Sequence, residues 1–341
     1  MNKRSLDGIT VDTESVTKFV SLVEKEEWSD EDLDRFVSTE GIQYIIQQEK
    51  EPGPNYSEDT VKSYLRKVKS GLSGEFGGWE TAWKEKTRMK KRLEYIFYRW
   101  SYLVERPFSV VREYLPYWKT IKGVFYILPG GIQKSYSSPE GFGINLGCRD
   151  KSDTHWMLSF ARECYLFYLI HIRNEKPHIT ECRAPLDFVR VFLDLTMRDG
   201  MALLVGLKAA GIEEQFYNEQ LPHLEKAGSL YGEAFQMALD GRALMEAENI
   251  QKKVFTGYAS PCALLGFQIA RAVEESDSRI GHSIAKEMLL GSVGTYVPFF
   301  EICEAYGKHI SNIPQVVWKA FKQVRRETDT QSVTEDYTFP T

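Results

Sequence analysis

The chain has 341 residues, of which 43% are hydrophobic and 13% aromatic, and this is enough apolar material for a folded protein with a substantial core. The formal net charge of −5 gives no general reason to expect a nucleic acid or an anionic membrane as a partner. The five cysteines form no Cys-x-x-Cys, which favours reduced thiols over a disulfide framework or a cysteine-rich zinc site.

Two further absences in the sequence bear on where the protein works. Residues 1–15 lack the apolar core of a secretory signal. No apolar run approaches the roughly 20 residues that span a bilayer. We therefore expect a soluble, cytoplasmic protein with no nucleic-acid or membrane partner.

A helical N-terminal region is predicted over residues 1–90. Apolar residues recur at helical spacing in 13–27 and again in 57–72. Ser29 and Asp32 stand in the positions of a capping box, which predicts a helix that begins between them. The segment GLSGEFGG (71–78) is a candidate hinge because its glycines oppose a helix.

One long helix is predicted over residues 80–105, with a basic first half and an aromatic second half. Lys84–Arg92 contains six positive residues and one negative residue. This run could be a phosphate-binding strip or the solvated face of a packed helix. We favour the solvated face, because charge runs in an acidic chain are usually exposed to water.

Strands are predicted only between residues 123 and 148. The segments GVFYILPGG, IQKSYSS and GFGINLG are short, rich in β-branched and aromatic residues, and separated by turn residues. From Asp153 to residue 327 the pattern is helical again, and the tail 328–341 is polar and expected to be disordered. The predicted fold class is α+β and predominantly α-helical.

A small sheet that leads into an apolar helix, followed by a second buried helix with an acidic residue, is the plan of a zincin. From about Glu105 to the tail, the order of elements resembles the gluzincin-like zinc-dependent peptidases of bacteria, including families known only as uncharacterised domains. The segments that carry the resemblance are REYLPYWKTIKGVFYILPGG, GFGINLG, FARECYLFYL, RDGMALL, GFQIARAVEE and GTYVPFFEICEAYG. It implies a zincin-like domain over 91–327, in which a small sheet packs on an active-site-type helix and GFGINLG is the edge strand above the cleft.

The zinc-binding motif of this family is degenerate here. Aligned on His-Glu-x-x-His, the segment ARECYL places Arg162 at the first histidine, Glu163 at the general base and Leu166 at the second histidine. Asp199 falls where the glutamate ligand belongs. An intact member would hold zinc, but neither a guanidinium nor an aliphatic side chain can donate a lone pair to a metal. We therefore expect no cofactor and no ordinary zinc hydrolysis.

Two interpretations of the charged pair in this helix remain open. Arg162 could form an ion pair with Asp199 and replace the metal as the link between two helices, and such a buried pair would be costly to break on one side. Alternatively, Arg162 and Glu163 could lie on a solvent-facing strip of the helix.

Other catalytic signatures in the sequence are weak. A metal could be held by a second cluster, which comprises His171, Glu175, His178 and Glu181. Pro177 interrupts the helix between the two halves of this cluster, and its polar surroundings suggest an exposed helix end. Cys164 lies in apolar surroundings, which should raise the pKa of its thiol and reduce its reactivity.

Three functional hypotheses follow. The first is a pseudoenzyme that has lost zinc and peptidase activity and binds a peptide or protein in its former substrate cleft by strand addition at GFGINLG. The second is an active metal-dependent hydrolase with non-standard ligands, or one that uses Glu163 and Asp199 as paired acids. The third is a helical structural or regulatory protein whose resemblance to zincins is coincidental.

Overall fold

The computed structural model describes residues 5–50, 56–72, 74–115, 120–147, 152–173, 182, 184–242, 249–255, 257, 259–276 and 315–316. The chain divides into two compact units. The first, here called the sheet unit, comprises Met1–Glu113 and Tyr117–Tyr168; the second, the helical unit, comprises Tyr114–Pro116 and Leu169–Thr341. The regions 1–90 and 91–327 that we predicted have other boundaries, and that division stays a prediction. The tail 328–341 lies outside the described residues.

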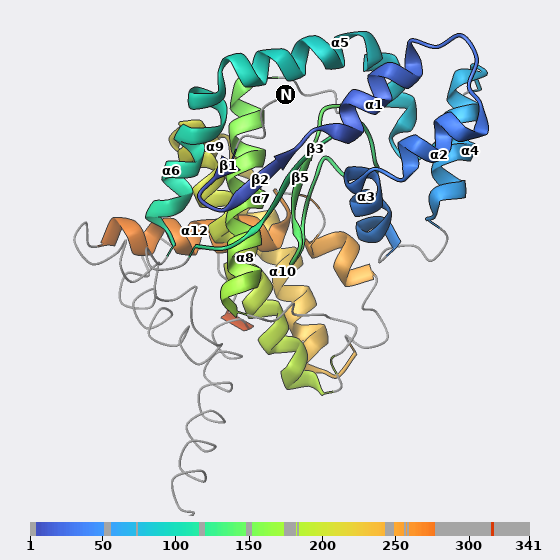
Figure 1. Cartoon of the computed structure of the whole chain (residues 1–341). Helices are drawn as coiled ribbons and strands as arrows, with labels where there is room; N and C mark the ends of the chain where they lie inside the picture. The colour runs from blue at the N-terminus through green and yellow to red at the C-terminus, as the bar shows by residue number, and fades with distance from the viewer. Residues whose placement is uncertain are drawn as a thin grey trace, which may run out of the picture. The chain divides into compact units, whose positions relative to one another are not determined.

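The sheet unit mixes helices and short strands, as the predicted α+β class requires (Figure 1). Its elements in chain order are β1 (Ser5–Leu6), β2 (Ile9–Asp12), α1 (Glu14–Val23), α2 (Asp30–Val37), α3 (Glu40–Lys50), α4 (Glu58–Lys69), α5 (Trp79–Tyr98), the π-helical turn η1 (Ser101–Glu105), α6 (Arg106–Glu113), β3 (Gly123–Leu128), β4 (Ser135–Ser137), β5 (Gly141–Asn145) and most of α7 (Asp153–Arg173). The helix that we predicted over 80–105 therefore ends at Tyr98. Of the six basic residues in the run Lys84–Arg92, four are exposed, as expected for a solvated face, and two are half-buried: Lys84, Arg88, Lys90 and Lys91 are exposed, and Lys86 and Arg92 are half-buried.

The described strands form one mixed sheet in the order β1-β2-β3-β5-β4. β2 pairs with β3 in parallel, β3 with β5 in parallel, and β4 with β5 antiparallel. Two predictions are corrected here. The strands are not confined to 123–148, because Ile9–Asp12 adds to β3 from the N-terminus. GFGINLG is not an edge strand either, because β5 lies between β3 and β4.

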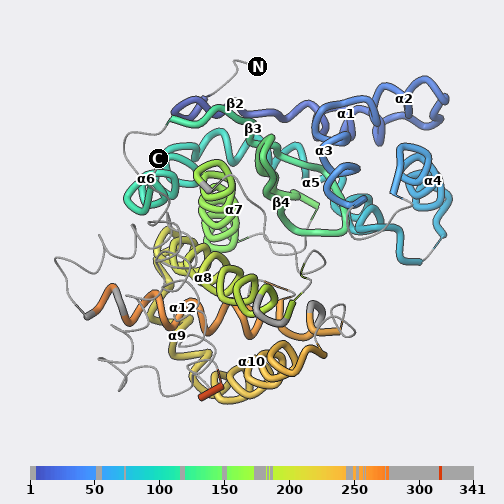
Figure 2. Tube along the Cα trace, turned by 90° about the horizontal axis from the view of Figure 1, so that it is seen from below, coloured from blue at the N-terminus to red at the C-terminus, as the bar shows by residue number. Residues whose placement is uncertain are grey.

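Helices cover both faces of this sheet (Figure 2). Alternation along β3 sends Tyr126 to one face, where its ring stacks on Tyr44 of α3 at 4.5 Å between centroids. Phe125 points to the other face, where its ring meets Phe160 of α7 edge-on at 5.1 Å. The sheet is therefore buried on both sides, which explains why its central strands read as nearly continuous apolar runs.

A buried carboxylate holds the turn between β3 and β4. Glu49 of α3 accepts hydrogen bonds from the backbone N–H of Ile132 and from the hydroxyl of Tyr136. Burial raises the pKa of Glu49 above its usual value of 4.5, and these hydrogen bonds oppose the shift. Its second oxygen, Oε2, is buried without a hydrogen-bond partner among the described residues, so it is the natural place for a proton.

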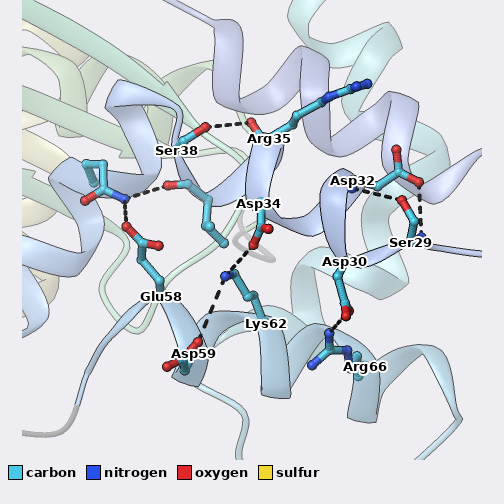
Figure 3. Close-up of polar contacts among 12 residues, drawn as sticks. Ser29, Asp30, Asp32, Asp34, Arg35, Ser38, Glu58, Asp59, Lys62 and Arg66 are labelled. Carbon is cyan, nitrogen blue, oxygen red and sulfur yellow. Dashed lines mark hydrogen bonds and ion pairs between the residues drawn. The ribbon is translucent and has the colours of Figure 1, made fainter.

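The helices α2 and α4 are joined by polar contacts at the surface (Figure 3). The predicted capping box is confirmed, since the Ser29 hydroxyl accepts from the Asp32 N–H and the Asp32 carboxylate accepts from the Ser29 N–H, both at 3.2 Å. Lys62 of α4 lies 2.5 Å from a carboxylate oxygen of Asp34. Exposed pairs of this kind add little stability each, so the apolar faces of these helices supply most of it.

The described part of the helical unit contains helices and helical turns but no strand. Its elements are the end of α7, then α8 (Pro185–Ala210), α9 (Glu213–Gln220), η3 (Leu221–His223), α10 (Leu224–Leu239), η4 (Gln251–Phe255) and α12 (Pro261–Ser276). The helices α8 and α12 meet at two glycines. A Cβ at Gly266 would lie 1.9 Å from the carbonyl oxygen of Thr196, and a Cβ at Gly200 would lie 2.1 Å from the backbone of Gly266. The two backbones therefore touch where no side chain fits.

Among the helices that the structure describes, none combines the length and apolar composition that a bilayer-spanning segment needs.

The raised pKa of Glu49 predicts a pH dependence of stability. The folded state holds this proton more tightly than the unfolded chain does, so the group stabilises the fold fully below its unfolded pKa, and the effect is lost as pH rises through the raised pKa. Glu49→Gln removes the titration. We expect the stability of the variant relative to the wild type to improve as pH rises above about 4.5. Urea denaturation of both proteins across a pH series measures this, and a pH-independent difference would contradict it.

The glycine crossing predicts a severe effect of a single methyl group. Gly266→Ala places a Cβ against the Thr196 carbonyl, so α8 and α12 must separate. We expect a loss of more than about 3 kcal/mol of unfolding free energy, since a tightly packed interior cannot accommodate the shift. Thermal unfolding followed by circular dichroism checks this. A variant that melts within a few degrees of the wild type would show that the helices can move apart freely.

Candidate functional site

Glu163 lies on the face of α7 that packs against the sheet. It shares this face with Trp156, Phe160 and Phe167, at helical spacings of three and four residues. The residue is only 2% exposed. Its carboxylate accepts a hydrogen bond of 2.8 Å from the hydroxyl of Ser135 on β4 and a second from Arg162. The carboxylate is thus buried, paired and hydrogen-bonded, as a buried charge must be.

Arg162 is the cation that accompanies this carboxylate. Its side chain is 18% exposed, and its guanidinium forms an ion pair with Glu163. The Nε atom is buried and has no hydrogen-bond partner among the described residues. The interpretation that this pair lies on a solvent-facing strip is therefore wrong, because Glu163 faces the sheet. Leu166, at the second-histidine position, is buried in the apolar part of the unit.

Asp199 belongs to α8 of the helical unit and is buried. Its carboxylate oxygen lies 3.0 Å from Nε of the neighbouring Arg198. The ion pair between Arg162 and Asp199 that we predicted would join the two units, and it stays a prediction.

The donor set at these positions does not fit a zinc ion. Arg162 and Leu166 offer no lone pair, and Glu163 already accepts from Arg162 and Ser135. Within the described parts of the chain, no three His, Cys, Asp or Glu side chains gather closely enough to hold a metal. His171 of the alternative cluster is half-buried near the end of α7, whereas Glu175, His178 and Glu181 lie outside the described residues.

Ser135 is the partner of Glu163 that sequence reasoning missed. β4 sends Ser135 to the α7 side of the sheet and the next residue, Tyr136, to the α3 side, where it reaches Glu49. The alternation of Ser and Tyr in KSYSS was the available signal. It predicted a strand, but not which carboxylate each side chain would meet.

The buried cysteines are not candidates for nucleophiles. Burial raises the pKa of Cys164 on α7 and of Cys262 on α12 well above their usual range. A neutral thiol is a poor nucleophile, so the low reactivity that we predicted for Cys164 agrees with its environment.

Comparison of the chain with protein-family models, with curated proteins and with solved structures found no match in any of the three.

The pairing around Glu163 predicts strong coupling between two substitutions. Arg162→Met leaves a buried carboxylate without its cation and should lower the unfolding free energy by about 3 kcal/mol. Glu163→Gln in the same chain removes the uncompensated charge, so the double variant should regain a large part of this loss. Urea denaturation of the wild type, the two single variants and the double variant measures the coupling.

The same cycle made with Asp199→Asn tests the pairing predicted from sequence. If the coupling energy of Arg162 with Asp199 exceeds that with Glu163, the guanidinium interacts mainly with Asp199 of α8. Additive effects of Arg162→Met and Glu163→Gln would contradict the ion pair within α7.

Proposed function

We propose that this protein has a gluzincin-like plan, does not hydrolyse peptides, and binds an extended peptide as an added strand at the outer edge of β4. The observation that carries the proposal is the state of Glu163. The side chain at the general-base position is buried and engaged by Arg162 and Ser135. A general base must reach a water molecule, and a carboxylate that is 2% exposed, with Oε1 held by both partners, is poorly placed to do so.

The edge of the sheet supports the binding part of the proposal. β4 is the terminal strand beside β5. The backbone oxygen of Lys134 accepts from the N–H of Asn145, and the N–H of Ser138 donates to the oxygen of Gly141, both at 2.9 Å. Because inward and outward residues alternate in an antiparallel ladder, the N–H and C=O groups of Ser135 and Ser137 point to the outer side. These are the groups that an added strand uses.

The position of Ser135 links this edge to the former catalytic centre. Its backbone faces the outer edge, while its hydroxyl donates to the Glu163 carboxylate at 2.8 Å. A peptide on β4 would therefore lie next to the residue that serves as the base in an intact zincin. Because GFGINLG (β5) lies inside the sheet, the proposal moves strand addition from that segment to β4, and it omits the chemistry of the family.

A proline at the edge tests strand addition. Ser137→Pro removes an outward N–H that the sheet does not use, and an edge strand tolerates proline there. We expect peptides selected from a random library to lose at least about tenfold in affinity for this variant, because one backbone hydrogen bond of the added strand is lost and the ring obstructs the edge. Ser137→Ala keeps the N–H and should bind as the wild type does.

Fluorescence anisotropy with labelled peptides measures the affinities, and the melting temperature of each variant verifies its fold. Equal binding by the proline and alanine variants, or a library that yields no binder, would contradict strand addition. Zinc bound stoichiometrically to the purified protein, together with peptide hydrolysis that Glu163→Gln abolishes, would overturn the non-catalytic part.

A further inference from the structure

The sheet unit contains a pocket of about 170 Å³ between α5 and the beginning of α7. Its apolar lining comes from separate parts of the chain and comprises Met89, Ile96, Leu103, Leu146 and Trp156. The polar lining comprises Glu85, Arg88, Arg92 and Tyr95 of α5 together with Ser152 and Asp153. Arg88, Arg92 and Ile96 follow each other at intervals of four residues, and Tyr95 lies three residues after Arg92, which places cations and apolar groups on one side of the helix.

The volume of the pocket sets the size of the molecule that it can take. An engineered protein cavity of about 150 Å³ accommodates benzene, so about 170 Å³ has room for one six-membered ring. Tyr95 is 41% exposed, so the lining reaches solvent on the side of α5. A ring can therefore enter the pocket from this side, and a polar substituent on the ring would then stay near the surface.

Two guanidiniums (Arg88 and Arg92) and two carboxylates (Glu85 and Asp153) line the pocket, and the pairing of Asp153 with Arg99 leaves positive charge in excess there. The Arg88 side chain is 74% exposed, and its Nη1 lies 3.7 Å from a Glu85 oxygen, which is longer than a hydrogen bond. Asp153 is already engaged, because it accepts from Arg99 at 3.2 Å and from the Tyr95 hydroxyl at 2.9 Å. Arg88 therefore forms a long ion pair with Glu85 and no hydrogen bond to it, so its guanidinium can also bond to a second carboxylate.

Trp156 contributes its indole to the wall of the pocket. The residue is 3% exposed, and its Nε1 is buried. We therefore assign the indole an apolar contact with the ring of a ligand, and the N–H takes no part in the binding that we propose.

We propose that this pocket binds a small organic acid whose apolar part is about the size of one six-membered ring and whose carboxylate pairs with Arg88. The ring occupies the space lined by Met89, Ile96 and Leu103. The carboxylate stays near the solvent side of α5, where a charge-assisted hydrogen bond to a guanidinium is favourable. This site is separate from Glu163 and from the peptide-binding edge of β4.

Benzoate is the probe for this proposal, and two analogues separate its parts. Benzamide keeps the ring and lacks the charge, whereas acetate keeps the charge and lacks the ring. By isothermal titration calorimetry we expect benzoate to bind with a dissociation constant of about 1 mM or below, and each analogue to bind at least about tenfold more weakly.

Substitution of two exposed cations on the same helix, one in the pocket lining and one outside it, tests whether Arg88 binds the carboxylate. Arg88→Gln should weaken benzoate binding about tenfold, because the charge-assisted hydrogen bond is lost. Lys84→Gln lies one turn earlier on the same exposed face and outside the pocket lining, so it should change binding by less than about twofold. Both positions are exposed, so neither variant should affect folding, and thermal melting verifies this.

Three results would overturn the proposal. Benzoate that gives no saturable binding up to about 10 mM would show that the pocket is not a site for such acids. Benzamide that binds as well as benzoate would show that the charge has no role. Equal losses in Arg88→Gln and Lys84→Gln would show general attraction to the basic face of α5 rather than a site at Arg88.

Discussion

The aromatic contact between the sheet and α7 determines the arrangement of the sheet unit. Phe125 and Phe142 lie side by side on β3 and β5 with their rings stacked at 4.8 Å, and Phe160 of α7 meets both rings edge-on. Such contacts combine large buried area with a preferred geometry, so they fix the rotation of the helix about its axis. Once this rotation is set, Glu163 must face the sheet, because it lies three residues after Phe160.

The short strand β4 depends on two buried carboxylates. Ser135 donates to Glu163 on one face of the sheet, and Tyr136 donates to Glu49 on the other. A shift of the strand by one residue would exchange the two faces and leave both carboxylates without these partners. Since a buried polar group without a hydrogen-bond partner is costly, the two acids fix the register of a strand that is only three residues long. The edge that we propose for peptide binding is therefore held in one position before any partner arrives.

In the helical unit, close contact between two helix backbones buries a polar side chain, which then needs hydrogen-bond partners. Gly200 and Gly266 let α8 and α12 approach until Thr196 is buried between them. The Thr196 hydroxyl bonds to the backbone oxygen of Phe192 at 2.6 Å and also contacts Tyr231 and Cys262. The tight crossing thus links three helices through one small polar group, which a larger side chain at either glycine would disrupt.

The sequence by itself determined the local features of the chain. The capping box of Ser29 and Asp32, the strands within 123–147 and the apolar helices from Asp153 to Ser276 follow from hydrogen-bonding groups and hydrophobic periods that act over a few residues. The sequence also showed that Arg162 and Leu166 cannot be metal ligands, because the ability to donate a lone pair depends on the side chain alone.

Only the tertiary structure decided how these elements pair. The strand order that places β5 inside the sheet, the addition of β2 from the N-terminus, and the donation from Ser135 to Glu163 all join residues that are distant in sequence. Periodicity states which face of an element is buried but not against what. That choice depends on which apolar surfaces fit together and which buried polar atoms find partners, and both are properties of the whole fold.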